Sequence, residues 1–293
     1  MTVKHRHIRP YPAFLAYFAF ALPLLAALTF ASALAAPAPQ STTVLLGGGA
    51  DDPTLALLAS LLPSRQAPIE ILTAATQHAP ATTHAAYARV LAKLGCPHVG
   101  HLQVAENQPA DAPATLARLR AATLVFITGG DQERLTERLL GTQFLEVLRR
   151  RHQHDASFIL AGTSAGASAL GGQMLVAGRG WRSLLGGRIE VIPGLGLLPD
   201  WLIDQHFIER ERYPRLLHAV LAHPNLLGLG LSEETGLLLR PGQPAEVFGT
   251  EVVFVADARR LTATNYPTLA KGQPVSARGL RVDLLVAGDR LEW

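Results

Sequence analysis

The sequence predicts an α/β fold, in which helices cover both faces of a mostly parallel β-sheet and the last third adds an antiparallel extension. Apolar runs of strand length alternate with longer segments of helical periodicity over the first two thirds of the chain. The runs 124–128 and 157–161 are strongly apolar, as expected for central strands buried on both faces. The last third instead has short apolar runs joined by tight turns, which favours antiparallel pairing at one edge of the sheet.

The chain is predicted to begin with a secretory signal peptide over residues 1–35, followed by a single domain over 36–293. A basic segment precedes an apolar run over 13–31, and Ala33-Leu34-Ala35 fits a cleavage site with small residues. An uncleaved anchor is the alternative, because this run approaches the length that spans a membrane. Pro23 and the small-residue end favour cleavage, so the expected location is secreted or periplasmic.

The charge of the chain gives little support for a nucleic-acid or membrane partner. The three basic residues of the leader account for the net charge of +3, and 23 of the 26 Lys and Arg remain against 23 Asp and Glu. The domain is then formally neutral, so we expect neither nucleic acid nor, after leader cleavage, a membrane as its partner. Cys96 is the only cysteine. An internal disulfide is therefore excluded, and a buried structural thiol is expected.

The elements of the first two thirds follow in a regular order. Predicted strands cover 43–46, 69–73, 99–104, 124–128 and 157–161. Predicted helices cover 52–62, 81–94 and 133–151. Asp52 and Pro53 fit the start of the first helix, because Asp is a preferred N-cap and Pro suits the first turn. The basic run 149–151 suits the end of the third helix, where the helix dipole favours positive charge.

The last third supplies the short strands of the predicted extension. They cover 226–231, 236–239, 245–249, 252–256 and 280–286. Tight turns connect most of them, which is the usual pattern of an antiparallel meander.

The motif Gly162-Thr163-Ser164-Ala165-Gly166 follows one predicted strand and precedes a small-residue helical pattern. This order of strand, tight turn and helix is what a nucleophile elbow requires. Ser164 would then lie at the strand tip, and the N–H of Ala165 could stabilise an oxyanion. A Gly-rich turn without chemistry is the alternative, since the chain has 26 glycines.

Two further glycine motifs follow predicted strands. Gly47-Gly48-Gly49 invites a nucleotide-binding interpretation, but the spacing and the nearby Asp51 and Asp52 argue against it, and a tight turn explains it. Gly129 and Gly130 end a second buried strand and could offer an N–H to the same oxyanion. Gln132, just after them, could orient a substrate. A polar helix cap at Asp131 is the alternative there.

A nucleophilic serine needs a base, and His206 is the strongest candidate. It ends an apolar run that turns polar at Asp204 and Gln205. Glu233 follows another apolar strand and could orient the imidazole, with Glu234 as its local competitor. Either glutamate alone is more simply a solvated loop residue. The order Ser, His, acid argues against an α/β-hydrolase, in which the acid precedes the histidine.

Three arginines crowd the residues after this histidine: Arg210, Arg212 and Arg215. Such a cluster is usually a solvated face. Beside a catalytic histidine it could instead bind carboxylates, because the guanidinium fork matches their geometry.

Taken together, these blocks resemble the cyanophycinases, which belong to the serine peptidase family that also holds the aspartyl dipeptidases. The resemblance rests on four segments in order: FITGGDQ at 126–132, GTSAGA at 162–167, IDQHF at 203–207 and GLSEET at 230–235. The approach PGLGLL at 193–198 is also similar. The match covers most of the chain after the leader, and the joint pattern is far more specific than any single segment.

The resemblance implies a role for each matching position. Ser164 would be the nucleophile, His206 the base and Glu233 its orienting acid, meeting at one edge of a single sheet. The implied substrate pocket comprises Gln132, Asp204, Gln205, Arg210, Arg212 and Arg215. The implied fold is similar to the class I glutamine amidotransferases and flavodoxin-like proteins. No cofactor and no metal are implied, and a homodimer is an open possibility.

The implied activity is that of an exported serine exopeptidase. The family substrate is cyanophycin, a poly-aspartate backbone with arginine on each β-carboxyl, and similar proteins release β-Asp-Arg dipeptides. Two departures concern the substrate: the segment 178–182 is unlike the usual family loop, and Ser232 and Glu234 stand where aspartates are expected. An aspartyl dipeptidase-like hydrolase of short acidic peptides is the main alternative. An esterase and a catalytically inactive binding protein are the others.

Overall fold

The computed structural model describes residues 40–49, 52–77 and 79–292. The predicted signal peptide lies outside these residues. Within them, no helix is both long enough and apolar enough to cross a membrane.

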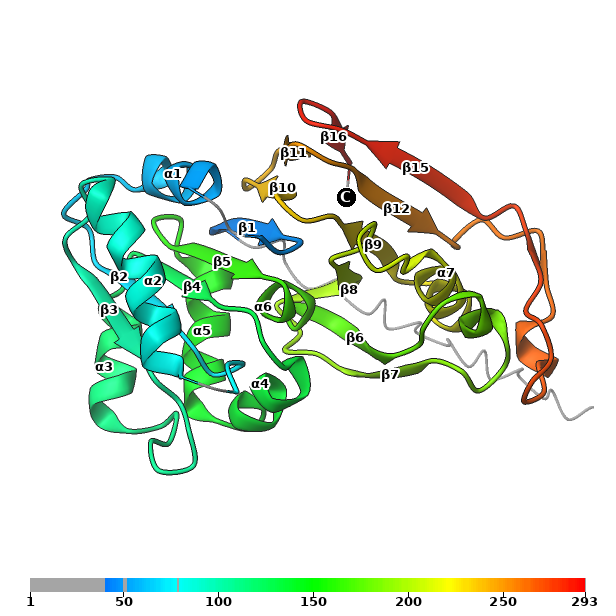
Figure 1. The fold of residues 1–293 in the computed structure, drawn as a ribbon, viewed down its shortest axis with the longest axis horizontal. Helices are drawn as coiled ribbons and strands as arrows, with labels where there is room; N and C mark the ends of the chain where they lie inside the picture. The colour runs from blue at the N-terminus through cyan, green and yellow to red at the C-terminus, as the bar shows by residue number, and fades with distance from the viewer. Residues whose placement is uncertain (1–39, 50–51, 78, 293) are drawn as a thin grey trace, which may run out of the picture. The chain divides into compact units, whose positions relative to one another are not determined.

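The larger of the two main sheets has eight strands in the order β16-β11-β10-β1-β5-β4-β2-β3. Five neighbouring strands form its parallel half: β1 (Thr42–Leu46), β5 (Ile159–Thr163), β4 (Leu124–Ile127), β2 (Ile69–Leu72) and β3 (Val99–Leu102). Antiparallel pairing then adds β10 (Thr235–Leu239), β11 (Ala245–Gly249) and β16 (Arg290–Leu291) at the β1 edge. The predicted α/β class, with an antiparallel C-terminal extension, is confirmed (Figure 1).

The second main sheet has six strands in the order β15-β12-β9-β8-β6-β7. Their bounds are β6 (Gly171–Ala177), β7 (Glu190–Pro193), β8 (Leu198–Gln205), β9 (Leu227–Leu231), β12 (Val253–Asp257) and β15 (Arg281–Leu285). The central pairs β6–β8 and β8–β9 are parallel. A separate hairpin pairs β13 (Ala263–Thr264) with β14 (Ala277–Arg278).

Helices and sheets bury three apolar layers. One lies against the large sheet under α1 (Asp52–Leu61) and α2 (Pro80–Lys93), and it includes Cys96. The second joins residues of both main sheets with α3 (Pro113–Ala121), α4 (Gln132–Leu139) and α5 (Gln143–His154). The third packs α7 (Tyr213–Ala222) against the second sheet through Phe207 and Leu216. Removing this apolar surface from water is the main force that holds the layers together.

Two expectations of the sequence analysis are corrected, and several elements were missed. The predicted helix 133–151 is two helices, α4 and α5, because Thr142 acts as the N-cap of α5 and accepts a hydrogen bond from the N–H of Leu145. The antiparallel extension of the large sheet contains only β10, β11 and β16, since the other short C-terminal strands, β9, β12 and β15, belong to the second sheet. The elements α3, β6, β7, β8 and α7 were not predicted. The start of α7 was hard to recognise because the helix directly follows the charged cluster 209–212.

Candidate active site

Ser164 lies in the turn between β5 and the short helix α6 (Ala165–Ser168). Its φ of 52° and ψ of −119° are unusual for a residue with a side chain, and such backbone strain tends to occur at functional sites. The N–H of Ser164 donates to the carbonyl of Leu46 at the end of β1, at 2.9 Å. The turn therefore has the geometry of a nucleophile elbow.

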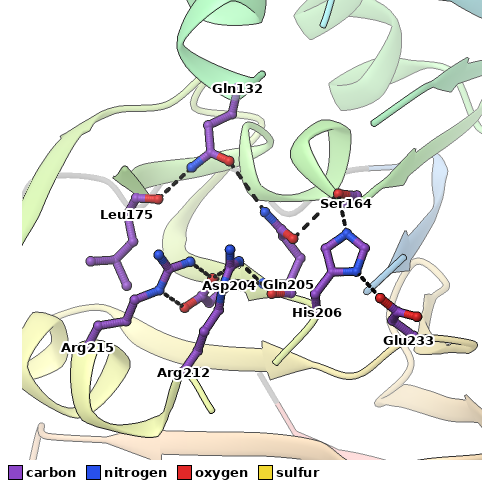
Figure 2. A network of polar contacts seen from close by, with 9 residues as sticks. All are labelled: Gln132, Ser164, Leu175, Asp204, Gln205, His206, Arg212, Arg215 and Glu233. Atoms are coloured by element: carbon purple, nitrogen blue, oxygen red, sulfur yellow. Dashed lines mark hydrogen bonds and ion pairs between the residues drawn. The ribbon is translucent and has the colours of Figure 1, made fainter. Parts of the chain in front are cut away.

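His206 follows β8 directly and also has a positive φ, of 46°. Its Nε2 lies 2.8 Å from Oγ of Ser164, and its Nδ1 lies 2.5 Å from Oε1 of Glu233 (Figure 2). Glu234 is turned differently: its N–H donates to the carbonyl of Gly48 at 3.0 Å. Of the two glutamates left open by the sequence, Glu233 is the one that contacts the imidazole.

We expected the three side chains to meet at the edge of a single sheet, but they come from two different sheets. Ser164 follows a strand of the large sheet, whereas His206 and Glu233 follow neighbouring parallel strands of the second sheet. Consecutive carbonyls at the end of β1 connect them. Leu46 accepts from the N–H of Ser164, Gly47 from that of His206 and Gly48 from that of Glu234. These backbone bonds position both sheets for the contact.

The protonation of His206 follows from its surroundings. Burial lowers the pKa of the imidazole because it disfavours the charged form, and the hydrogen bond to Glu233 opposes this effect. The nearby positive charge of Arg210 also lowers the pKa. The net shift is downward, so the neutral imidazole that can accept a proton from Ser164 prevails at neutral pH.

Two of the three residues expected to stabilise an oxyanion, Gly129 and Ala165, lie next to Ser164. A Cβ placed on Gly129 would be 3.1 Å from Cβ of Ser164 and 3.4 Å from its Oγ, so this backbone passes next to the hydroxyl. Ala165 follows Ser164 directly. Among the described residues, no partner within the protein is found for the N–H groups of Gly129, Gly130 and Ala165. They are free to donate to a reacting carbonyl oxygen.

Two glutamine side chains extend from Ser164 in a chain of polar contacts. Oε1 of Gln205 lies 3.4 Å from Oγ of Ser164, and its Nε2 lies 3.5 Å from Oε1 of Gln132. Nε2 of Gln132 donates to the carbonyl of Leu175 at 2.5 Å (Figure 2). Both amides line a cavity of about 250 Å³ that also includes Gly130. Substrate next to Ser164 would therefore meet oriented amide groups.

Asp204 lies behind this cavity and is only 1% exposed. Its carboxylate accepts from Nε of Arg215 at 2.6 Å, from Nη2 of the same arginine and from Nη1 of Arg212 at 3.0 Å. Nη1 of Arg212 also donates to the carbonyl of Gln205 at 2.6 Å. The carboxylate thus orients two arginines rather than facing the cavity itself.

Of the three arginines expected in the pocket, only Arg210 is an exposed residue. Burial lowers the pKa of Arg212 to about 10; the charge of Asp204 opposes this shift, and those of Arg215 and Arg210 add to it. All three arginines line the small cavity and also a larger one of about 810 Å³. Five of the six expected pocket residues therefore line one cavity, Asp204 lies behind it, and Gln205 connects it to Ser164. In the described part of the chain, no three His, Cys, Asp or Glu side chains are grouped to hold a metal ion.

Comparisons with known proteins identify the family of this chain. The profile of peptidase family S51 matches residues 44–246, which include the segments of Ser164, His206 and Glu233. The chain belongs to peptidase family S51. It is a serine-type peptidase.

Curated relatives of this S51 peptidase are named cyanophycinase. The protein from Trichormus variabilis is 34% identical over 259 residues, which cover 87% of this chain and 86% of the relative. That from Synechococcus elongatus is 37% identical over 203 residues, covering 69% and 63%. A crystal structure of a peptidase from an acI-B1 actinobacterium superposes with a TM-score of 0.61 at 22% identity, covering 87% of this chain and 98% of the other. That likeness supports the fold.

One contact of the S51 site was missed by the sequence analysis, which interpreted Gly47-Gly48-Gly49 as a turn only. Gly48 has a φ of 140°, and a Cβ there would lie 2.3 Å from Cε1 of His206. Only a residue without a side chain leaves room for the imidazole at this point. The sequence did contain a signal for this contact, because three consecutive glycines are more than a strand-to-helix turn needs.

Replacing Gly48 by alanine is expected to lower kcat/KM about a hundredfold, because the added methyl group displaces the imidazole from Ser164. Gly242→Ala is the matched control: this glycine also has a positive φ, of 67°, but a Cβ there would meet nothing within 4 Å. Steady-state hydrolysis by the two variants, with thermal unfolding of each, measures the effect. Equal activities in both variants would contradict the assigned contact.

Proposed function

We propose that this S51 peptidase hydrolyses cyanophycin and releases β-Asp-Arg dipeptides. The observation that carries the proposal is the hydrogen-bonded line from Ser164 through His206 to Glu233, placed beside a cluster of arginines. The names of the curated relatives support the same substrate. An arginine-rich pocket that also holds carboxylates suits a zwitterionic polymer.

The proposed reaction is acyl transfer to serine. Oγ of Ser164 attacks a backbone carbonyl of the polymer while Nε2 of His206 takes its proton. The N–H groups near Gly129, Gly130 and Ala165 stabilise the oxyanion, and Glu233 holds the imidazole through Nδ1. His206 then gives the proton to the leaving amine. Water, deprotonated by the same imidazole, releases the acyl group and restores Ser164.

Incubation of the purified protein with cyanophycin, followed by mass spectrometry of the products, tests this function. We expect β-Asp-Arg to accumulate as the main product. Asp-X dipeptides assayed in parallel distinguish an aspartyl dipeptidase-like hydrolase. Intact polymer together with rapid cleavage of the dipeptides would overturn the proposal in favour of that alternative.

We also propose that the protein is exported by its N-terminal segment. The support is the basic segment, apolar run and small-residue site of residues 1–35. Expression of the full chain in a Gram-negative host, followed by fractionation and N-terminal sequencing, tests it. The expected result is periplasmic protein that begins near Ala36. A product that retains Met1 in the cytoplasm would contradict it.

The acid limb of the pH profile is expected to lie below the ordinary histidine pKa of 6.5. Burial disfavours the imidazolium of His206, so its pKa is lowered and the neutral base persists as the pH falls through 6.5. Activity is lost only below the lowered pKa, where the imidazole becomes protonated. The measurement is kcat/KM against pH for an uncharged ester, whose own titration does not interfere. A limb centred above pH 7 would contradict the assignment.

A further inference from the structure

The larger cavity extends from the arginine cluster to a segment that the S51 site does not otherwise use. One wall is formed by Gly178, Arg179 and Gly180 after β6, together with Ser183 in the short 3-10 helix η1 (Trp181–Leu184). This wall includes most of the segment 178–182, which departs from the pattern of the cyanophycinases. Arg210, Glu211, Arg212 and Arg215 also line the cavity. Arg212 donates to the carbonyl of Gln205, and the side chain of Gln205 contacts Ser164, so a lining residue of this cavity is linked to the reacting centre through Gln205.

The charges around this cavity do not balance. Four guanidinium groups line it, those of Arg179, Arg210, Arg212 and Arg215. One carboxylate, that of Glu211, lines it with them, and Asp204 behind the wall pairs with two of the arginines. The excess positive charge favours a bound anion, and planar carboxylates match guanidinium donors best.

Ser183 is a second and independent sign of a ligand. The residue is 1% exposed, and its Oγ has no hydrogen-bond partner in the described part of the chain. A buried hydroxyl without a partner destabilises the protein unless a ligand or water satisfies it. A Cβ on Gly178 would lie 3.2 Å from this Oγ, so a side chain at this position would crowd the hydroxyl.

The wall that carries Ser183 is held in place by hydrogen bonds to other segments of the chain. The carbonyl of Ser183 accepts from Nδ1 of His218, a buried residue of α7, at 2.6 Å. The carbonyl of Leu184 accepts from the N–H of Val275 at 2.8 Å, and the N–H of Gly186 donates to Gln273 at 2.8 Å. A wall fixed in this way loses little conformational freedom when a ligand binds.

We propose that this cavity is a second substrate subsite, which binds a carboxylate-bearing side group of the polymer next to the unit being cleaved. Arg179 and the hydroxyl of Ser183 hold the carboxylate. Each side group of cyanophycin carries an arginine with a free carboxylate and a guanidinium, and Glu211 is placed to meet the latter. The inference rests on the proposed function for the identity of this side group. Its residues Arg179, Ser183 and Glu211 lie outside the set that the family resemblance implied.

Substitution of Arg179 by alanine tests the subsite by kinetics. We expect KM for cyanophycin to rise about tenfold, with the loss falling on KM rather than kcat, because one charge-assisted hydrogen bond to substrate is removed. Arg179→Lys is expected to recover part of this loss. Arg182→Ala is the matched control, since Arg182 is an exposed arginine of the same segment that lies 5.7 Å from the Trp181 ring and does not line the cavity. Equal KM values for the two alanine variants would overturn the subsite.

Binding to Ser164→Ala tests the subsite separately from catalysis. The probe is a synthetic trimer of β-Asp-Arg units, compared by calorimetry with a trimer whose arginine carboxylates are converted to amides. We expect the acid trimer to bind at least tenfold more tightly, and Arg179→Ala to remove this difference. If that pattern appears but the wild-type enzyme leaves cyanophycin intact, the proposed function fails and the subsite stands. If cyanophycin is cleaved but both trimers bind alike, the subsite fails alone.

Ser183→Ala supplies a readout that a purely structural role would not give. Removing an unpaired buried hydroxyl should leave the thermal midpoint of the free protein unchanged or raise it, while binding of the acid trimer weakens several-fold. A lowered midpoint with unchanged trimer binding would contradict the role assigned to this hydroxyl.

Discussion

Replacing Ser164 by alanine is expected to lower kcat/KM for peptide hydrolysis by a factor on the order of 10⁴ to 10⁶. The hydroxyl that lies 2.8 Å from Nε2 of His206 is the only group of the site placed to form the acyl-enzyme among the described residues. Without it, substrate binding and the oxyanion donors remain, and they account for a small residual rate. The loss should therefore appear in kcat, with KM little changed.

The fold of this variant should stay intact. The backbone N–H of Ser164, which donates to Leu46, is retained when the side chain is shortened. Ser168→Ala is the matched control, since Ser168 lies four residues further on in the same turn-and-helix segment and has no contact with His206 or Glu233 among the hydrogen bonds of the site. Circular dichroism, thermal unfolding and initial rates of both variants give the comparison. Full activity in Ser164→Ala would rule out the mechanism.

The second large effect is expected for Glu233→Gln, with a fall in kcat/KM of about a hundredfold to ten-thousandfold. The amide keeps the size of the side chain but lacks the charge that stabilises the imidazolium, and it can present an N–H to Nδ1 and so favour the wrong tautomer. The Glu233 side chain is 42% exposed, so water can replace part of this contact and the lower end of the range is expected. The measurement is single-turnover acylation.

Glu234→Gln separates the two neighbouring glutamates. Glu234 is held by its backbone N–H, which the substitution retains, so its activity should stay within a few-fold of the wild type. Comparable losses in both variants would show a general effect on the loop rather than a role for the carboxylate of Glu233.

Much of the site could be predicted because its signals are local. A serine between small residues after a buried strand marks the elbow, and an apolar run that turns polar marks His206. The choice between Glu233 and Glu234 could not be made locally, because adjacent residues share composition and surroundings in the sequence. It depends on the positive φ of Glu234 and on the hydrogen bond from its N–H to the carbonyl of Gly48, a residue that is distant in the sequence.

The second sheet was hidden for a related reason. The strand β6 pairs with β7 and β8 only after the chain has crossed from the first sheet, and the apolar residues of these strands do not alternate clearly. The same limit applied to Asp204. Its position beside the histidine indicated a pocket residue. Its burial under Arg212 and Arg215 depends on α7, a helix that the charged residues before it made hard to recognise in the sequence.

The most direct test of the central claim is covalent labelling of the serine that the histidine and the glutamate activate. The protein is treated with a fluorophosphonate, digested and mapped by mass spectrometry, beside Ser164→Ala and His206→Ala. We predict one adduct per chain, on Ser164, absent from the first variant and formed at least a hundredfold more slowly in the second. An unlabelled Ser164, or labelling at an undiminished rate without His206, would contradict the account.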